Sequence, residues 1–538
     1  MQTDTIAAIA TALSDSGIGI IRISGENAIS VADSIFVNKF GKKILMNVQS
    51  HTIHYGFIID HEYLSFLPES GSVNYNTDDI SLTDSYQAPD CNKKIIDEVL
   101  VSVMKAPYSY TRENVVEINC HGGVYVTQKI METILHAGAR LAEPGEFTKR
   151  AFLNGRIDLS KAEAVMDLIQ SRNEMALSSS VSQLRGDLSK KIKKFREILI
   201  YEIAFIESAL DDPEHISLSG YPDRLYKIIC ELILEHQKLI NSSDNGKLIK
   251  EGISTVILGK PNAGKSSLLN ILVGKERAIV TDIAGTTRDI IEEHINLNGI
   301  SLNIIDTAGI RNTGDKVEKI GVDIAKKYAK DADLIVYVVD SSVEIDDNDR
   351  EIMSLIRGKN TIILLNKSDK DVIVGFQDIE NLMNSSNLKN LESSNIDDYI
   401  NNLGFSNSKF KKNIFEESGL ESSFENKNFC IKIIKTSTKN LTDRSGIVEF
   451  ENAVEELFFS GILKNNSEIL ITNIRHKEAL QNSLNSLMMV KKSIEDGMEE
   501  DFFSIDLMSS YSELGKIIGE KVEDDLVEEI FSKFCMGK

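Results

Sequence analysis

The sequence predicts a multi-domain α/β protein. In it, a domain with a mostly parallel sheet and helices on both faces is inserted into an α-helical domain, and an α+β domain precedes both. Three observations support this prediction. The chain has 538 residues, too many for one hydrophobic core. Its middle part alternates short apolar runs with helical segments, as a covered parallel sheet does. The segments before and after that part have the apolar spacing of helices.

The composition is that of an ordinary globular protein. Hydrophobic residues make up 42% of the chain and charged residues 26%. The start has no basic segment followed by a long apolar run, and no stretch approaches the roughly 20 apolar residues that span a bilayer. The five cysteines include no Cys-x-x-Cys pair. We therefore expect a cytoplasmic protein without membrane contact, zinc knuckle or thioredoxin-like motif.

The charge balance restricts how the chain can meet nucleic acid. Its net charge is −22, which repels phosphate backbones on average. Any RNA contact must then use a local basic patch or the surface of a partner. The candidate patch is the segment 190–196, which holds four lysines and Arg196 within one predicted helix. A solvated helix face is the favoured interpretation of this cluster.

Three kinds of sequence pattern divide the chain into domains. Strand-like runs at 18–23 and 115–118 lie in a glycine-punctuated first part. Later, a single helical stripe is expected from Val181, Leu184, Leu188, Ile192 and Phe195. We expect an N-terminal domain over 1–154 with a polar insertion at about 70–94, a first helical part over 155–248, the parallel-sheet domain over 249–460 with a low-complexity insertion at about 371–428, and a second helical part over 461–538.

The middle part contains a phosphate-binding motif. Apolar runs at 253–258, 302–305, 334–339 and 361–365 predict the strands of its sheet. The segment 259–266, Gly-Lys-Pro-Asn-Ala-Gly-Lys-Ser, follows the first run directly and matches G-x-x-x-x-G-K-S. Its glycines let backbone N–H groups point at phosphate oxygens. Lys265 adds positive charge at the β- and γ-phosphates, and the Ser266 hydroxyl suits Mg²⁺.

Three further motifs follow in the order that GTP-binding domains require. Asp-Thr-Ala-Gly at 306–309 ends a predicted strand, where Asp306 can hold Mg²⁺ through water. Asn-Lys-Ser-Asp at 366–369 follows the predicted strand at 361–365. Its aspartate can accept both N–H donors of a guanine edge. Ser-Thr-Lys at 437–439 is a weaker match to the loop that closes over the base. Together these motifs predict that the nucleotide is GTP.

A switch segment is expected between the first two motifs. Thr287 is the natural second hydroxyl for Mg²⁺, ordered while the γ-phosphate is present. We expect GTP to contact Asn262, Ala263, Gly264, Lys265, Ser266, Ser267, Thr281, Asp282, Ile283, Ala284, Gly285, Thr286, Thr287, Asp306, Thr307, Ala308, Gly309, Asn366, Lys367, Asp369, Ser437, Thr438 and Lys439.

The group that orients the attacking water is missing from its usual place. Ras-like GTPases carry a glutamine directly after Asp-x-x-Gly, whereas this chain has Ile310. An aliphatic side chain cannot orient water, so the catalytic group must come from elsewhere. Glu318 is a nearby candidate, and a solvated acid at a helix start is an equal alternative.

Beyond these motifs, the chain resembles one family, the MnmE (TrmE) tRNA-modification GTPases. The most specific stretches are 4–10, 18–25, 116–123 and 143–154, all outside the parallel-sheet domain. The chain also ends with Cys-Met-Gly-Lys, like the family's Cys-x-Gly-Lys terminus. The resemblance covers nearly the whole chain apart from the two polar insertions.

The resemblance implies how GTP is hydrolysed. Glu318 falls on the family's catalytic glutamate, which helps orient water when the G domains of a homodimer face each other. Asn262 falls on an asparagine that ligates K⁺, and Thr281, Ile283 and Thr286 complete that site. The K⁺ supplies the positive charge that an arginine finger supplies elsewhere. Lys265, Thr287 and Arg288 complete the implied catalytic set, although a rim salt bridge is an equal interpretation of Arg288.

The resemblance also implies a role for the N-terminal domain. In the family this domain binds 5-formyl- or 5,10-methylene-tetrahydrofolate and dimerises. The matching positions are Arg22, Glu117, Arg156 and Lys538, and cations suit the glutamate tail of folate. Cys535 matches a cysteine linked to modification. Three places depart from the family: the segment after Ala10, Arg112 where glycine is usual, and Asp212 where phenylalanine is usual.

The expected function follows from the resemblance. With an MnmG (GidA)-type flavoprotein that carries FAD, in a heterotetramer or larger assembly, the chain would install 5-carboxymethylaminomethyl or aminomethyl groups on the wobble uridine, U34, of tRNA. Two alternatives stay open. An Era-like regulatory RNA-binding GTPase would perform no chemistry on a base. An interaction scaffold with a degenerate G domain is disfavoured by the intact Lys265, Ser266, Thr287 and Asp306.

Overall fold

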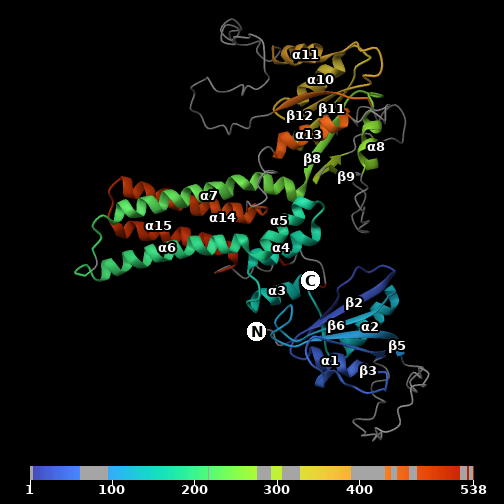
Figure 1. Cartoon of the computed structure of the whole chain (residues 1–538), viewed down its shortest axis with the longest axis vertical. Coiled ribbons are helices and arrows are strands. Elements are labelled where there is room, and N and C mark those ends of the chain that lie inside the picture. The colour runs from blue at the N-terminus through green and yellow to red at the C-terminus, as the bar shows by residue number, and fades with distance from the viewer. Residues whose placement is uncertain are drawn as a thin grey trace. The chain divides into compact units, whose positions relative to one another are not determined.

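The structure is a computed structural model of the whole chain (Figure 1). It describes residues 4–60, 95–215, 217–275, 292–297, 299–305, 328–388, 430–437, 445–459, 469–520, 530–531 and 537. The chain divides into two compact units. The first comprises Met1–Ile169, Val181–Ile233 and Asn482–Lys538, and the second comprises Gln170–Ser180 and Leu234–Gln481. Among the described helices, none is long and apolar enough to cross a membrane.

The first unit contains a seven-stranded sheet in the order β3-β4-β5-β6-β2-β1-β7. Its strands are β1 (Ile6–Ile9), β2 (Ser16–Ser24), β3 (Phe36–Asn38), β4 (Thr52–Ile59), β5 (Ile95–Met104), β6 (Val115–Gly122) and β7 (Arg140–Leu141), with a short 3₁₀ helix, η1 (Leu45–Asn47), between β3 and β4. The strand pairs are antiparallel apart from β1 with β7. The strands expected at 18–23 and 115–118 are therefore confirmed as parts of β2 and β6.

The two-residue alternation of β2 and β6 separates a core face from a polar face. Ile21 and Ile23 of β2 and Ile118 of β6 are buried in one cluster with helices α1 (Ala28–Ile35) and α2 (Val124–His136). The residues between them point to the other face of the sheet. Arg22 and Glu117 are directly opposite each other there, as cross-strand partners of β2 and β6.

Helix α3 (Glu146–Leu153) belongs to that second face. Its Phe147 is fully buried and packs with Ile6 and Ala8 of β1 and with Ala142. Because α3 follows the edge strand β7 after four residues, its N-terminus is held close to the polar face of the sheet.

The helical part of the chain is built from segments on both sides of the second unit. Its helices are α4 (Leu159–Gln170), α5 (Glu174–Arg185), α6 (Asp187–Asp211), α7 (Tyr221–Glu251), α14 (Ile474–Glu495) and α15 (Glu500–Ile518). In the first unit, α6 and α15 lie side by side (Figure 1). Ser483 of α14 hydrogen-bonds Ser510 of α15 at 2.8 Å, and Tyr226 of α7 donates to Glu495 of α14 at 3.1 Å. Sequence-distant helices thus share one bundle, as an inserted domain requires.

The expected single stripe over 181–195 is wrong, because the helix breaks at Gly186. Its φ is +86°, and α5 ends before it while α6 begins after it. Leu188, Ile192 and Phe195 are buried on α6, so the stripe starts there. A Cβ at Gly186 would lie 2.6 Å from Lys161 Cε. The Lys161 side chain can move away, so it is the positive φ that favours a glycine at this break.

The second unit contains a six-stranded sheet in the order β13-β12-β11-β8-β10-β9. The strands are β8 (Ile253–Leu258), β9 (Glu292–Leu297), β10 (Ile300–Ile305), β11 (Leu334–Asp340), β12 (Asn360–Asn366) and β13 (Ile431–Lys435). All pairs are parallel except β9 with β10 at one edge. Each strand run expected in this domain is confirmed.

Helices cover both faces of this sheet, as predicted. Ile253 and Ile257 of β8 pack in a core with α8 (Lys265–Lys275) and α13 (Ser445–Phe459). Val256 and Leu258, which alternate with them, pack in a second core with α10 (Asp347–Leu355) and α11 (Phe376–Leu388).

Helix α11 corrects the expected bounds of the second insertion. Residues 371–388 were expected to begin a polar surface segment, but α11 occupies most of them. Its Ile379 and Leu382 lie three residues apart, and both are buried against the sheet. This part is a packed helix of the domain, whereas 389–429 and the insertion expected at about 70–94 lie outside the described residues.

Candidate functional site

The loop after β8 has the backbone of a phosphate-binding loop. It leaves the strand at Gly259, where φ is +148° and a Cβ would lie 2.4 Å from the Val338 carbonyl oxygen. Asn262 and Gly264 also have positive φ, at +61° and +106°. These values require glycine at 259 and favour it at 264, while asparagine tolerates the left-handed region better than most residues. The strand-loop-helix context expected for the motif is present.

Helix α8 begins at Lys265, within the motif itself. Its N-terminus, with unpaired N–H groups and the positive end of the helix dipole, suits an anion. The Lys265 ammonium donates to the carbonyl oxygens of Gly259 at 2.6 Å and Lys260 at 2.8 Å. The Lys265 ammonium therefore lies against the backbone of the loop, where phosphate oxygens would bind.

The loops predicted to recognise the base meet the phosphate loop at one edge of the sheet. Asn366, the last residue of β12, donates from Nδ2 to the Ala263 carbonyl oxygen at 2.8 Å. Ser437, just after β13, donates from Oγ to Asp369 Oδ1 at 2.7 Å. The Ser368 hydroxyl donates to the Thr436 carbonyl oxygen at 3.0 Å. Since β12 and β13 are parallel neighbours, their carboxyl ends bring these loops together.

Lys367 is fixed by the neighbouring strand. It has a φ of +61° and forms an ion pair with Asp340, the last residue of β11. Burial alone would raise the pKa of Asp340, but hydrogen bonds from Lys367 and Ser342 lower it below its ordinary value. The carboxylate is therefore charged at neutral pH, and it holds the Lys367 side chain at the mouth of the site.

Several predicted nucleotide residues lie outside the described residues. They are Thr281, Asp282, Ile283, Ala284, Gly285, Thr286, Thr287, Arg288, Asp306, Thr307, Ala308, Gly309, Glu318, Thr438 and Lys439. The strand before Asp306 is described, however. β10 ends at Ile305, which pairs with Val256 of the parallel strand β8. β10 therefore runs parallel to the strand that leads into the phosphate loop.

A second group of predicted residues meets on the polar face of the first unit. Arg22 Nε donates to Glu117 Oε1 at 2.8 Å. The Arg22 and Arg156 guanidinium carbons lie 5.6 Å and 4.7 Å from the centre of one ring, that of Tyr110. Arg22 Nη1 also donates to the Gly537 carbonyl oxygen at 3.2 Å. Gly537 directly precedes Lys538, which lies outside the described residues, as does Cys535.

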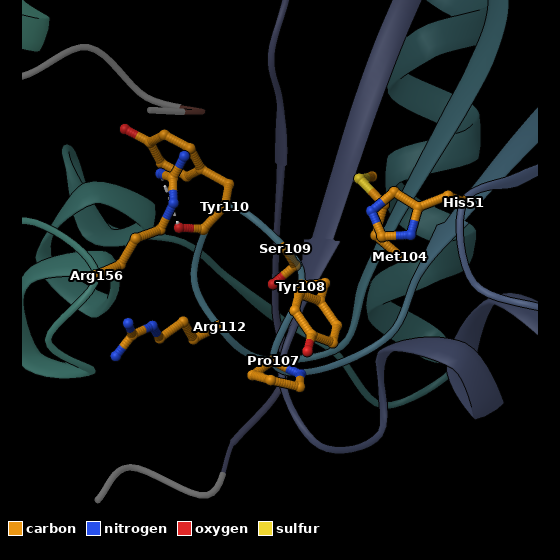
Figure 2. A pocket seen from close by; sticks show the side chains of 8 residues that line it. All are labelled: His51, Met104, Pro107, Tyr108, Ser109, Tyr110, Arg112 and Arg156. Carbon is orange, nitrogen blue, oxygen red and sulfur yellow. Dashed lines mark hydrogen bonds between the residues drawn. The ribbon is translucent and has the colours of Figure 1, made fainter. Parts of the chain in front are cut away.

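An open pocket of about 520 Å³ adjoins this group (Figure 2). Its lining residues are His51, Met104, Pro107, Tyr108, Ser109, Tyr110, Arg112 and Arg156. Two guanidinium groups and no carboxylate line it, although the whole chain is strongly acidic. Arginine suits carboxylates and phosphates, and tyrosine suits flat rings. This donor set fits a ligand such as folate, which combines an aromatic system with a carboxylate tail.

Sequence reasoning missed the ring that joins the two arginines. Arg156 Nη1 donates to the Tyr110 carbonyl oxygen at 3.1 Å (Figure 2). Tyr110 Oη lies 2.9 Å from Thr148 Oγ1 of α3. No spacing in the chain relates Tyr110 to Arg22 or Arg156, because only the sheet and α3 bring the three together.

Sequence reasoning also misjudged Arg196 in the basic segment of α6. Arg196 is 8% exposed, forms an ion pair with Glu520 and lies 4.1 Å from the centre of the Tyr511 ring. It is a packing residue between α6 and α15, so it does not belong to a surface patch. The exposed members of the segment are Lys190, Lys193 and Lys194.

Comparison with known proteins identifies relatives over the full length. Two family models match: "GTP-binding protein TrmE N-terminus" over residues 5–156 and "MnmE helical domain" over residues 159–535. The protein named tRNA modification GTPase MnmE of Lachnoclostridium phytofermentans is 49% identical and covers 100% of both chains. Proteins of the same name from Alkaliphilus oremlandii and Acetivibrio thermocellus are 42% and 44% identical, with 99% and 100% of both chains covered.

Solved structures match as well, among them one of an Era protein. An Aquifex aeolicus Era variant bound to GDP.AlF4- is 23% identical, covers 44% of this chain and 67% of its own, and has a TM-score of 0.23. A score this low carries no argument about the present chain.

Proposed function

We propose a function from one premise: the chain belongs to the MnmE family of tRNA modification GTPases. The chain is a GTP hydrolase that acts in tRNA modification. The observation that carries the GTPase part of this conclusion is the meeting of three loops at one sheet edge: the phosphate loop at 259–266, the loop after β12 and the loop after β13. The role in tRNA modification rests on the family.

The described residues support binding of GTP, and Mg²⁺ would bind with it. Backbone N–H groups of 262–266 and the Lys265 ammonium would hold the phosphates. Asp369 would accept the guanine N–H donors, and the Ser437 hydroxyl fixes that carboxylate. Ser266, with Thr287 and Asp306, would ligate Mg²⁺, a hard cation that prefers oxygen.

Potassium dependence is the next step of the proposal. Asn262, held at a φ of +61° in the phosphate loop, would ligate K⁺ with Thr281, Ile283 and Thr286. Glu318 would orient the attacking water, because Ile310 cannot. Hydrolysis would then depend on two G domains facing each other in a homodimer and would gate the modification without contributing atoms to it.

The N-terminal domain would bind tetrahydrofolate. Arg22, Arg156 and Lys538 would hold its carboxylates, Glu117 its pterin N–H donors, and Tyr110 would pack against a ring. The folate supplies a one-carbon unit when bound. With an MnmG-type flavoprotein carrying FAD, the product would be a 5-carboxymethylaminomethyl or aminomethyl group on U34 of tRNA in the cytoplasm. Cys535 would take part in that step.

The test is the GTP hydrolysis rate in K⁺ and in Na⁺ buffers, for the unchanged protein and for Glu318→Ala. We expect hydrolysis to require K⁺ and the variant to lose at least about 100-fold in kcat, the range of one general acid-base or water-orienting group. GDP affinity should stay unchanged in the variant. Equal rates in both salts would contradict the roles of Asn262 and Glu318.

Folate binding distinguishes the proposed function from the alternative, an Era-like regulatory GTPase. An Era-like regulatory GTPase would bind no tetrahydrofolate. We expect 5-formyl-tetrahydrofolate to bind the full chain and Arg22→Ala to weaken it, with GDP affinity as the control. A GTPase that binds no folate would favour the regulatory alternative.

A further inference from the structure

The side chain of Lys260, the second residue of the phosphate loop, contacts the start of α10. Its ammonium contacts three acceptors: Asp349 Oδ2 at 2.7 Å, Asp346 Oδ2 at 3.3 Å and the Glu344 carbonyl oxygen at 3.3 Å. An ammonium has three N–H donors, so these contacts satisfy it fully. The side chain is 13% exposed, which makes this a largely buried anchor.

The anchor point is rigid. Asp349 is 2% exposed, and its other oxygen accepts the hydroxyl of Tyr337 at 2.6 Å. Asp346 is the N-cap of α10, and with Asp349 it forms a capping box. Because Tyr337 lies in the middle of the central strand β11, Lys260 is connected to the core of the sheet. A capped helix end of this kind has little freedom to shift.

The backbone of the same residue holds the inner side of the loop. The Lys260 carbonyl oxygen accepts the Lys265 ammonium at 2.8 Å and the Ala263 N–H at 3.2 Å. Asn262, with its left-handed backbone, lies inside that turn. A movement of Lys260 would therefore shift the Lys265 charge and the N–H groups that face phosphate.

The charges of the anchor persist at neutral pH. Burial alone would lower the pKa of Lys260, but hydrogen bonds and charges of Asp349 and Asp346 raise it above its ordinary value. For Asp346, burial would raise the pKa, but the hydrogen bond from Lys260 is the largest of the contributions that lower it below its ordinary value.

We propose that Lys260 is a positioning residue for the nucleotide, which acts through Asp349 and Asp346 to hold the phosphate loop in its binding conformation. The start of α10 then belongs functionally to the GTP site, although it touches no nucleotide. This inference rests on the proposed GTPase function and adds to it a residue outside the motif's glycines, Lys265 and Ser266.

The test is the affinity for GDP and the kcat and KM for GTP of the full chain with Lys260→Met. We expect the Kd for GDP and the KM for GTP to rise about tenfold, which corresponds to roughly 1.4 kcal/mol. The kcat at saturating GTP should change less than about twofold, because bound GTP restores the loop. Lys260→Arg keeps the charge and should recover most of the affinity.

Two further variants separate positioning from stability. Lys260→Met leaves two carboxylates unpaired and will lower the melting temperature. Combining it with Asp349→Asn removes one of those charges, so the double variant should regain stability but not GDP affinity. Lys432→Met breaks the ion pair with Glu456 elsewhere in the same unit and should leave GDP affinity unchanged.

The outcomes are distinct. Wild-type GDP affinity in Lys260→Met, or full recovery of affinity along with stability in the double variant, would overturn the positioning role. Absence of GDP binding by the unchanged protein would instead contradict the proposed GTPase function.

Discussion

Four residues other than glycine have left-handed backbone in the described part of the chain, and they fall at two places. Asn262 and Lys367 lie in the predicted GTP site, and His51 and Arg112 line the open pocket of the first unit. Such conformations cost energy and persist where the surrounding structure imposes them. The distribution therefore supports a binding role for both places, independently of any motif.

Arg112 allows a direct test of this backbone cost. Its φ is +62°, and Nη1 donates to the Asn154 carbonyl oxygen at 2.8 Å. Arg112→Gly and Arg112→Ala both lose that hydrogen bond, so they differ only in the Cβ atom. We expect the glycine variant to be about 1 kcal/mol more stable than the alanine variant, because a Cβ strains the left-handed region. Urea denaturation followed by circular dichroism measures the difference, and equal midpoints would contradict the assigned φ.

Motif residues could be predicted from the sequence, whereas their supports could not. The strand, glycines and lysine at 253–265 lie within one short stretch, so spacing alone identifies them. Lys260 meets Asp349 only because β11 and α10 return to the loop about ninety residues later. Tyr110 and Arg196 likewise depend on contacts between sequence-distant elements. Local patterns carry no information about such pairings.

At the scale of elements, an ion-pair network with a buried centre, Glu146 and Arg150, attaches α3 to the sheet. Glu146 of α3 accepts Arg140 Nη2 of β7 at 2.7 Å and Arg150 Nη2 at 3.0 Å. The two arginines also contact Asp4, just before β1, at 2.7 and 2.8 Å. Glu146 and Arg150 are only 3% and 4% exposed. Removing one partner would leave a buried charge uncompensated.

The network should make the first unit sensitive to acid. Burial would raise the pKa of Glu146, but hydrogen bonds from Arg140, the Glu143 N–H and Arg150 lower it below its ordinary 4.5. A carboxylate whose pKa is lower in the folded state than in the unfolded state stabilises the fold. This stabilisation is complete at pH values above the unfolded-state pKa, and it is lost as the pH falls through the folded-state pKa. We expect Glu146→Gln to cost about 3 kcal/mol at pH 7 and progressively less below about pH 4.5.

Urea denaturation of the full chain at pH 7 and pH 4 measures this dependence. Glu132→Gln is the matched control, because Glu132 is 54% exposed and contacts Lys129 only at 3.4 Å. Its effect should stay within about 0.5 kcal/mol at both pH values. A Glu146→Gln penalty that is the same at both would contradict an ionised Glu146 as the source of the stability.

Element boundaries were predictable where periodicity was strong and failed where composition misled. The four apolar runs predicted in the second unit became β8, β10, β11 and β12, whereas the edge strand β9, with its Glu-Glu-His start, was not predicted. The Asn- and Ser-rich sequence after residue 381 suggested a surface loop. However, Ile379 and Leu382 of α11 are buried against the sheet, so the segment is a packed helix. Gly186 interrupts a continuous 3.6-residue apolar pattern, which by itself does not reveal a break. Side-chain burial, which decides both cases, is a tertiary property.

At the scale of the whole molecule, the two units have separate cores and separate predicted ligands. The core of the seven-stranded sheet and the two cores of the six-stranded sheet contain no common residue. The GTP motifs fall in the second unit and the arginine–tyrosine group in the first. The order of the domains could be predicted from the sequence. The contact between α6 and α15 in the helical bundle could not, because the two helices lie about 300 residues apart in the chain.

This division predicts which part of the molecule each ligand stabilises. A ligand that binds only the folded state adds RT ln(1 + [L]/Kd), about 2.7 kcal/mol at 100 times its Kd. Separate cores should unfold in separate steps, so a calorimetric scan of the full chain should show two transitions. We expect Mg²⁺–GDP to raise only the transition of the second unit, and 5-formyl-tetrahydrofolate to raise only that of the first.

Variants assign the two transitions. Lys265→Ala removes the ammonium that caps the phosphate loop, so the GDP-dependent shift should disappear while the folate-dependent shift remains. Arg22→Ala should have the converse effect, since Arg22 contacts Glu117 and Tyr110 in the first unit. A single transition that both ligands raise equally would mean that the units unfold as one. In that case the binding energy of GTP could be transmitted to the first unit through stability alone, without a change of conformation.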